Sequence, residues 1–314
     1  MVFDNSSLHR STVTLRHGSS LPSPKASDID GELLSCLSCF DSSILCADFF
    51  TPSASQNINQ QNITQKNVFL KTFTLENYDQ ACHLRERCAA LGAKITFPGQ
   101  WDYPSEFQWL EKPPRFLSYL GQPVWRKRSS LAVVGSREPH ARTLEWLDQH
   151  LTSVLRKRNL LVVSGAARGV DQRAHLLSVR CGQPTLAFLP SGLANPYPSF
   201  FSEMTSAILE AGGAVMSEYP PDQLMRKYHF LQRNRLIASL AKVVFIAEAS
   251  RRSGSMMTAR LAQAGRSRIC VLPSFPGDGA GSGTLELLIE GATPLRDADD
   301  LLSVCDLEMT NLKT

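Results

Sequence analysis

Small residues and arginines recur at the ends of short apolar runs of the sequence. Two such groups close or follow the runs 131–135 and 160–164, and they are Ser136 and Arg137, then Ser164, Gly165 and Arg168. A glycine backbone can approach a ligand closely, and a guanidinium can hold a phosphate through two hydrogen bonds. These residue types therefore indicate phosphate recognition where the apolar runs end.

Two later segments add the same chemistry at expected helix starts. They contribute Arg233, Asn234 and Arg235 in FLQRNRLIASL, and Ser253, Gly254 and Ser255 in EASRRSGSMMTARLA. Positive charge is normally unfavourable at a helix start, so we expect an anion to compensate the two arginines. Unpaired N–H groups at the second helix start also favour an anion. A tight turn explains any one of the glycines by itself, whereas the whole set favours a ligand.

An acid–base pair is the first alternative to simple binding. Asp171 and His175 stand four residues apart in RGVDQRAH and would share a helix face. No nucleophile or set of metal ligands accompanies them, so we favour a structural role. In that role Asp171 satisfies N–H groups or fixes Arg168, and His175 packs against the sheet. We therefore expect no catalytic residue.

Motifs for cofactors and metals are incomplete. Neither G-x-G-x-x-G nor G-x-x-x-x-G-K-[ST] occurs, so we expect no dedicated cradle for a pyrophosphate cofactor or a hydrolysed triphosphate. Cys36 and Cys39 have C-x-x-C spacing, but no second pair of that spacing or nearby histidine completes a zinc site. The sequence thus predicts neither a cofactor nor a metal.

Hydrophobic patterning predicts the elements that position these residues. Six β-rich apolar runs alternate with helix-length segments, at 131–135, 160–164, 185–190, 214–218, 242–248 and 268–273. Such runs are typical of parallel strands that are buried on both faces. We predict an extended Rossmann-like α/β fold with a mostly parallel, doubly wound sheet, which binds ligands at the carboxyl ends of its strands. A helix over 75–93 and a short strand at AKITF precede it.

Composition divides the chain into three parts. Residues 1–66 are rich in Ser, Asn and Gln, so we expect a segment that is partly disordered or forms short helices, with 50–67 as a linker. Residues 67–306 are predicted to form the Rossmann-like domain. Residues 307–314 are expected to be a C-terminal tail, with no winged-helix domain.

Net charge and targeting signals say less about the function than the motifs do. The formal net charge of +4 is too small to prove a nucleic-acid partner, although the excess of basic residues lies after residue 66. No stretch approaches the roughly 18 apolar residues needed to cross a bilayer. The first ten residues lack the apolar region of a secretory signal, and the cysteines form no regular framework. We expect a cytoplasmic protein.

The motifs taken together closely resemble those of the bacterial DNA-processing protein A family (DprA, also called Smf). The matching stretches, in the family's order, are YPSEFQWLEKPPRFLSYLG, VVGSREP, VVSGAARGVDQRAH, LPSGLANPYP, SEYPP, FLQRNRLIASL, EASRRSGSMMTARLA and GSGTLELLIEGA. Ala166 stands where the family usually has Leu, a change expected to affect packing more than binding. Residues 1–66 do not obviously match the sterile-alpha-motif type of helical domain that many members carry.

This resemblance implies an extended Rossmann fold that dimerises and binds single-stranded DNA with little sequence preference. It also implies a role in loading the recombinase RecA during natural transformation, and no catalytic activity. Carried onto this sequence, the DNA-binding positions are those of the four segments described above: Ser136, Arg137, Ser164, Gly165, Arg168, Arg233, Asn234, Arg235, Ser253, Gly254 and Ser255.

Two other functions stay open. GSGTLELLIEGA is faintly similar to the PGG-x-GT-x-x-E signature of Rossmann nucleoside-monophosphate phosphoribohydrolases, with Glu286 in the place of the carboxylate. The compact double glycine before GT is missing, which weighs against that enzyme. The second option is a scaffold whose main partner is a protein, with DNA binding incidental.

Overall fold

The structure, a computed structural model, describes residues 32, 36, 75–126, 128–265 and 267–310. The predicted N-terminal segment therefore lies outside the described residues, apart from Glu32 and Cys36, and so does the end of the predicted C-terminal tail. The proposed division at 66/67 remains a prediction.

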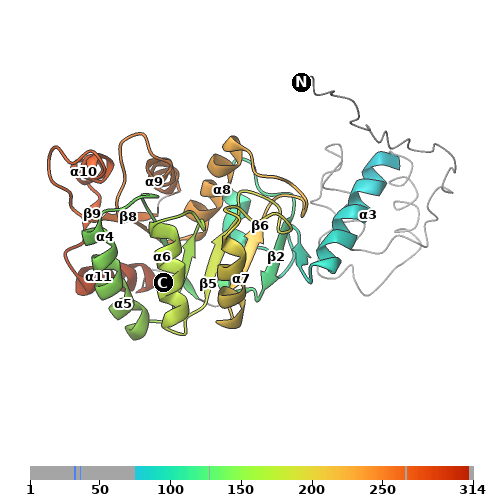
Figure 1. Cartoon of the computed structure of the whole chain (residues 1–314), viewed down its shortest axis with the longest axis horizontal. Helices are drawn as coiled ribbons and strands as arrows, with labels where there is room; N and C mark the ends of the chain where they lie inside the picture. The colour runs from blue at the N-terminus through green and yellow to red at the C-terminus, as the bar shows by residue number, and fades with distance from the viewer. Residues whose placement is uncertain (1–31, 33–35, 37–74, 127, 266, 311–314) are drawn as a thin grey trace, which may run out of the picture.

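A mixed nine-stranded sheet forms the centre of the described part of the chain, in the order β1-β2-β6-β5-β4-β3-β7-β8-β9 (Figure 1). Its central strands run parallel and are β6 (Ala214–Ser217), β5 (Thr185–Phe188), β4 (Leu160–Ser164), β3 (Ser129–Val134), β7 (Val243–Ile246) and β8 (Arg268–Val271). All six predicted apolar strands are thus confirmed, together with the predicted Rossmann-like fold class.

The two edges of the sheet extend this parallel centre. Strands β1 (Lys94–Thr96) and β2 (Leu117–Gly121) pair antiparallel and continue from β6, and β9 (Thr293–Pro294) pairs parallel with β8. The predicted short strand at AKITF corresponds to β1. The sequence patterns did not predict β2, because the double proline before it excluded only a continuous helix, and they missed the two-residue β9.

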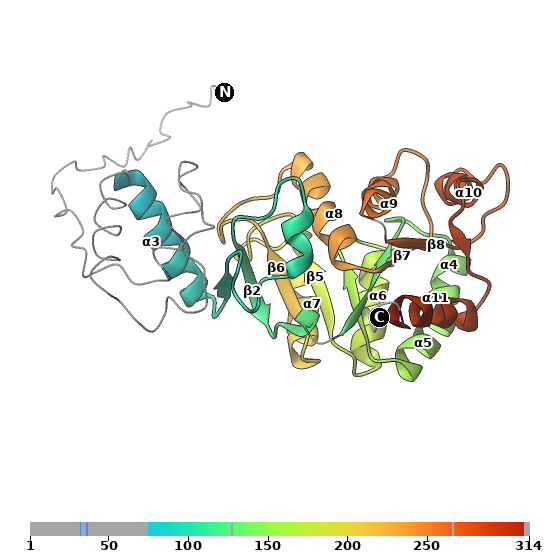
Figure 2. The same ribbon diagram turned by 180° about the vertical axis from the view of Figure 1, so that it is seen from behind.

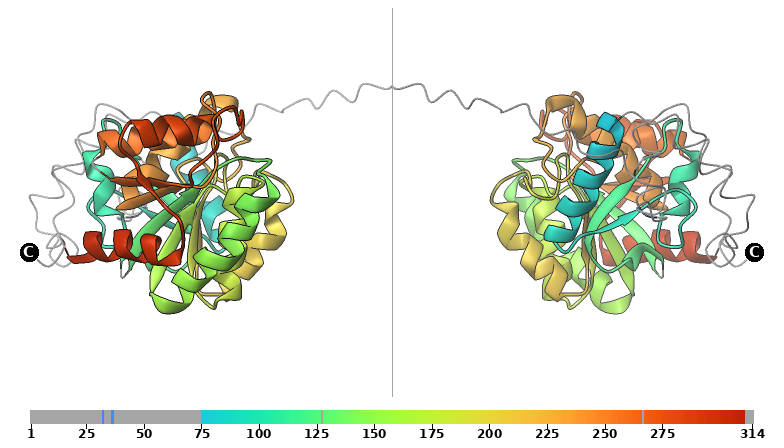
Figure 3. Two further views of the ribbon diagram at one scale, coloured as in Figure 1. Left: turned by 90° about the vertical axis from the view of Figure 1, so that its left-hand side faces the viewer. Right: turned by 90° about the vertical axis from the view of Figure 1, so that its right-hand side faces the viewer.

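Helices cover both faces of the sheet, as the two views in Figure 3 show. One face packs against α8 (Lys227–Leu240) and α9 (Gly254–Ala264). The opposite face packs against α5 (Thr152–Lys157), α6 (Val170–Arg180), α7 (Phe201–Glu210) and α11 (Ala298–Thr310). A π-helical turn, Leu147–Leu151, joins α5 to α4 (Ala141–Trp146). No helix among the residues described is long and apolar enough to span a membrane.

The remaining helices lie at the two ends of the sheet. Helix α3 (Leu75–Ala90) is packed beyond the β1 and β2 edge, and α10 (Ser282–Ile289) lies near β8 at the other end (Figure 2). Helix α3 confirms the helix expected within 75–93, and its last residue is Ala90, two residues before the Gly92 at which the spacing ended.

Strand β3 shows why the runs are continuously apolar. Leu131 and Val133 pack into the core on one face of the sheet, while Ala132 and Val134 pack into the core on the other. From β3 the chain builds β4, β5 and β6 on one side, and later β7, β8 and β9 on the other. The strand order therefore switches direction between β3 and β7, where open α/β sheets hold their ligands.

Candidate functional site

Four chain segments meet at the carboxyl ends of the parallel strands, and we call them the rim. They are the β3–α4 loop (135–140), the β4–α6 loop (165–169), residues 230–235 of α8 and residues 253–255 at the start of α9. The N–H of Val170 donates to the carbonyl of Ser136 at 3.1 Å, and Ser255 Oγ donates to the carbonyl of Gly135 at 2.8 Å. The sequence-predicted segments are therefore brought together by direct contacts.

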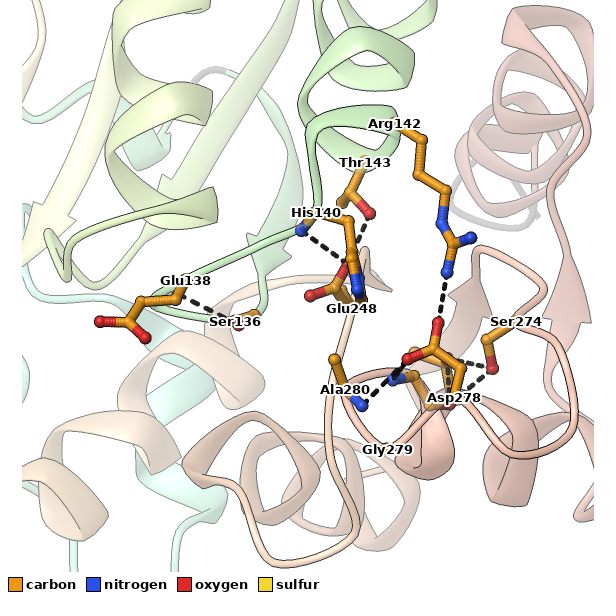
Figure 4. Close-up of polar contacts among 12 residues, drawn as sticks. Ser136, Glu138, His140, Arg142, Thr143, Glu248, Ser274, Asp278, Gly279 and Ala280 are labelled. Atoms are coloured by element: carbon orange, nitrogen blue, oxygen red, sulfur yellow. Dashed lines mark hydrogen bonds and ion pairs between the residues drawn. The ribbon is translucent and has the colours of Figure 1, made fainter.

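Arg137 and Arg168 are the rim arginines whose side chains face solvent. They come from the loops after β3 and β4, which are neighbouring strands of the sheet. Arg168 forms an exposed ion pair with Glu138, and the backbone N–H of Glu138 donates to Ser136 Oγ at 3.1 Å (Figure 4). Both guanidiniums can therefore reach an anion above the strand ends, although Arg168 must exchange its partner to do so.

Helix α9 begins as its sequence predicted. Ser253 is the N-cap residue, and its side chain accepts a hydrogen bond from the N–H of Met256 at 3.3 Å. Gly254 is exposed and Ser255 half-buried. The start of α9 thus offers backbone N–H donors beside the β3–α4 loop, where the helix dipole favours an anion.

Arg233 lies in the interior of α8, so the prediction that it stands at a helix start is wrong. The helix begins seven residues before Asn234, at Lys227, where the His229 ring accepts a hydrogen bond from the N–H of Arg226 at 3.2 Å. This contact caps the helix earlier than the apolar pattern of 236–240 indicated. The compensating anion expected for a basic helix start is consequently not required.

Buried Arg233 instead links the loops from inside. Its Nη1 donates to the carbonyl oxygens of Gly165 and Phe188, the latter at 3.0 Å. Burial lowers the pKa of Arg233 to about 10, while the nearby charge of Asp171 acts in the opposite direction. The guanidinium therefore positions the ends of β4 and β5 and has little surface for a phosphate.

Internal contacts also hold the buried backbone of Gly165 and the side chains of Ser164, Asn234 and Arg235. Ser164 is fully buried, and its Oγ donates to the carbonyl of Val133 at 2.6 Å. Asn234 Nδ2 donates to the carbonyl of Gly254 at 3.2 Å, which ties α8 to α9. Arg235 pairs with Glu218, whose pKa is raised by burial despite that charge. These side chains support the rim from below.

Asp171 and His175 occupy the structural positions that the sequence favoured. Asp171 is buried and accepts hydrogen bonds from the N–H groups of Gly165 and Ala167 at 3.2 and 3.4 Å. Burial raises its pKa, and Arg233, rather than Arg168, supplies the opposing charge. His175 Nδ1 lies 2.8 Å from Thr185 Oγ1 on β5, and burial lowers the pKa of the ring to about 3. The pair lies beneath the rim with no access for acid–base work.

Phe230 is a rim residue that the sequence reasoning missed. The Arg137 guanidinium carbon lies 4.9 Å from the centroid of its ring, and Tyr197 contacts the ring edge-on at 5.7 Å. Phe230 itself is half-buried, whereas Tyr197 and Tyr228 are exposed. The available signal was an aromatic residue directly before the basic LQRNR stretch, because aromatic rings beside arginines can stack bases.

Glu286, the carboxylate of the enzymatic alternative, is paired with two arginines of other segments. It lies 3.1 Å from Arg251 Nε and 3.5 Å from Arg260 Nη2. Across 75–126, 128–265 and 267–310, with residues 32 and 36, no group of three or more metal-binding side chains occurs. Glu286 therefore belongs to a surface ion-pair cluster.

Residues 94–306 match a protein-family model described as DNA recombination-mediator protein A. The chain is 30% identical over 216 residues to Protein Smf of Borreliella burgdorferi, covering 69% of this chain and 68% of that protein. It is 33% identical over 204 residues to the DNA processing protein DprA of Streptococcus pneumoniae, covering 64% and 70%. It spans 46% of the Escherichia coli Protein Smf, at 35% identity.

Two solved structures share both fold and sequence with this chain. The X-ray structure of DprA from Streptococcus pneumoniae superposes with a TM-score of 0.66 at 28% identity, covering 87% of this chain and 90% of that one. A structure of DNA processing protein A from Helicobacter pylori gives a TM-score of 0.60 at 30% identity, covering 70% and 96%. The latter structure addresses that protein's single-stranded DNA binding mode.

Proposed function

Because the chain belongs to the DNA recombination-mediator protein A family, as its motifs predicted, we propose that it binds single-stranded DNA along the rim. The observation that carries this proposal is the exposed pair Arg137 and Arg168 on neighbouring strand ends, with the Phe230 ring beside Arg137. The Helicobacter pylori relative is described as binding single-stranded DNA, which supports the same ligand here.

Phosphates and bases have different partners on this surface. Arg137, Arg168 and the N–H groups at the start of α9 attract the phosphates through charge-assisted hydrogen bonds. A base stacks on Phe230 or on the plane of Arg137. Stacking reads the face of a base rather than its edge, so binding has little sequence preference. Paired bases in a duplex present no free face, so single strands bind more tightly.

The buried members of the predicted set act through position. Ser164, Arg233 and Asn234 tie the strand ends and helices together, so that the exposed donors are held in place before DNA arrives. Such preorganisation lowers the entropy that binding must offset. Their substitution is therefore expected to reduce affinity together with stability.

Membership of the family supports a proposal for the cellular role. We infer that the protein is a cytoplasmic homodimer that delivers single-stranded DNA to the recombinase RecA in natural transformation. Its function is binding rather than catalysis, since the titratable pair beneath the rim, Asp171 and His175, is buried among structural contacts. We propose that residues 67–306 form the domain that carries out this function.

Mobility shifts with matched single- and double-stranded oligonucleotides at two salt concentrations test the proposal. We expect Arg137→Ala and Arg168→Ala each to weaken single-strand binding, and each to reduce the salt slope by about 0.7 log units per lost phosphate contact. Arg158→Ala is the matched control, because Arg158 pairs with Asp306 away from the rim. Unchanged affinity and slope in both rim variants would show that the DNA lies elsewhere.

A further inference from the structure

Tyr197 is an exposed aromatic residue beside the rim. It lies in the loop between β5 and α7, and its ring stands nearly perpendicular to that of Phe230, with 5.7 Å between the ring centroids and 79° between the planes. The Arg137 guanidinium carbon is 4.9 Å from the same Phe230 centroid. Because Arg137 follows β3 and Tyr197 follows β5, the three side chains form a row across the strand ends.

Backbone contacts anchor the loop that carries Tyr197 to the loop after β6. The N–H of Gly192 donates to the carbonyl of Gln223 at 2.8 Å, and the N–H of Ala194 donates to that of Pro221 at 2.9 Å. A Cβ atom at position 192 would lie 2.1 Å from the Pro221 carbonyl oxygen, so glycine permits this close approach. The loop is therefore held in place where it leaves β5, which lowers the entropy that binding must offset.

Asn195 and Asp222 extend this anchor to helix α3. Asn195 Nδ2 donates to the carbonyl of Asp222 at 3.0 Å. The Asp222 carboxylate accepts hydrogen bonds from Arg87 Nε at 2.7 Å and Nη2 at 2.6 Å, and it lies 3.2 Å from His83 Nε2. The acidic side chain of the adjoining loop is thus paired with α3, so it repels a nearby phosphate less than a free carboxylate would.

The start of α8 brings positive charge to the same end of β5. Arg226 and Lys227 are both exposed, and neither forms an ion pair with a residue that the structure describes. His229 Nδ1 accepts a hydrogen bond from the N–H of Arg226 and lies 2.9 Å from the carbonyl oxygen of Pro190, two residues after β5. These two cations therefore favour an anion on the Tyr197 side of the rim.

We propose that the bound single strand continues past Phe230 across the ends of β4 and β5, and that a second base stacks on Tyr197. This inference rests on the proposed DNA binding and adds a base-stacking position to the same surface. An exposed ring on an anchored loop suits an unpaired base of any kind, because every base has a π-face. The phosphates that flank this base then lie between Arg137 on one side and Arg226 and Lys227 on the other.

Fluorescence anisotropy of the full chain with a labelled single-stranded oligonucleotide tests the assignment. We expect Tyr197→Ala to weaken binding by about five- to hundredfold, the range for one stacked base. The salt slope should stay near the wild-type value, because no phosphate contact is lost. Tyr197→Phe keeps the ring and should keep most of the affinity.

Tyr228→Ala is the matched control. Tyr228 is an exposed tyrosine of α8 whose ring contacts His229, and it leaves the helix on a different side from Phe230, two residues further on. We expect this variant to bind as the wild type does. An equal loss in Tyr228→Ala and Tyr197→Ala would overturn the assignment.

An oligonucleotide made of abasic sugar–phosphate units separates stacking from charge. It presents the same phosphates without bases, so Tyr197→Ala should bind it as tightly as the wild type does. If the loss in Tyr197→Ala persists on the abasic strand, Tyr197 acts through its loop or through a phosphate, and the proposal is wrong.

The alternative role for Tyr197 is to hold Phe230 in place. Adding Tyr197→Ala to Phe230→Ala distinguishes the two roles. A base stacked on Tyr197 predicts a further loss of at least about fivefold in the Phe230→Ala background, whereas a positioning role predicts none. No further loss therefore rejects the proposal.

Photocrosslinking of the wild type to a strand that carries 5-iodouracil gives a check that needs no variant. An adduct at Tyr197 supports the proposal, and adducts at Phe230 without any at Tyr197 oppose it. The proposed function fails in a different way. If the wild type binds no single strand, DNA binding is rejected together with the Tyr197 position. If Arg137→Ala weakens binding and Tyr197→Ala does not, only the Tyr197 position is rejected.

Discussion

Glu138 is an acidic residue within a surface assigned to phosphates. Its side chain is highly exposed and pairs with Arg168, while its own N–H is held by Ser136 Oγ. A carboxylate in this position competes with a phosphate for the same guanidinium. The positive charge of the rim is therefore partly neutralised by its own loop.

Glu138→Gln should consequently strengthen single-stranded DNA binding. The expected gain is a few-fold, since exposed ion pairs are worth only about 0.2–1 kcal/mol. The gain should shrink as salt increases. Fluorescence anisotropy with a labelled oligonucleotide measures it, with Glu145→Gln, an exposed α4 glutamate, as control. Equal gains in the two variants would attribute the effect to net charge alone.

Phe230 separates the contribution of bases from that of phosphates. Phe230→Ala should cost about 1–3 kcal/mol of single-strand affinity if one base stacks on the ring, while the salt slope stays near the wild-type value. Phe230→Tyr retains a ring and serves as the control. A lower salt slope in Phe230→Ala would mean that the ring mainly positions Arg137, over which it lies.

Residue types at the strand ends were readable from the sequence, but the direction of each side chain was not. Arg137 and Arg168 lie in loops, three and four residues after the ends of β3 and β4, so their exposure was predictable. Arg233 was misplaced because α8 begins at Lys227, six residues before it, and that start depends on a His229 contact with Arg226 that no apolar period encodes. A basic residue then falls on the buried helix face, where carbonyl groups from distant strands accept its hydrogen bonds.

At the scale of elements, Arg233 connects α8 to two strand ends. Its guanidinium donates to the carbonyl of Gly165, just after β4, and to that of Phe188, the last residue of β5. Its charge faces that of Asp171 at the start of α6. The ends of β4 and β5 and the start of α6 therefore depend on one side chain of α8. The charge on either partner is tolerable in the core only while the other is present.

Arg233→Ala should lower the free energy of unfolding by about 3–5 kcal/mol, because it leaves the Asp171 carboxylate buried without its counter-charge. Urea denaturation measures the loss. Adding Asp171→Asn removes the uncompensated charge, so the double variant should recover part of the stability. A double variant whose losses simply add would show that the two side chains act independently.

Elements buried on both faces were the most predictable part of the fold. All six central strands carry uninterrupted apolar runs because helices cover both sides. Strand β2 was missed since its residues, LSYLG, follow two prolines and pair antiparallel at the sheet edge. Two-residue β9 is defined by its contact with β8 rather than by any pattern of its own.

At the scale of the whole molecule, the buried His175 and Asp171 make the free energy of unfolding depend on pH in opposite directions. The pKa of His175 falls from 6.5 to about 3, so below pH 6.5 the unfolded chain binds a proton that the folded chain does not. That difference lowers stability as pH falls. The pKa of Asp171 is raised by burial, so the folded chain takes up its proton first, which raises stability as pH falls.

His175→Gln isolates the first part. The variant lacks the histidine but retains Asp171 and the other histidines, and glutamine can still bond Thr185. Between about pH 6 and pH 4 the wild type should lose up to about 1.4 kcal/mol more per pH unit than the variant, the value for one proton. Urea unfolding at stepped pH values gives both slopes. Parallel slopes would mean that His175 takes up its proton in the folded state, which requires water or a carboxylate to reach a ring that the packing of α6 against β5 now keeps dry.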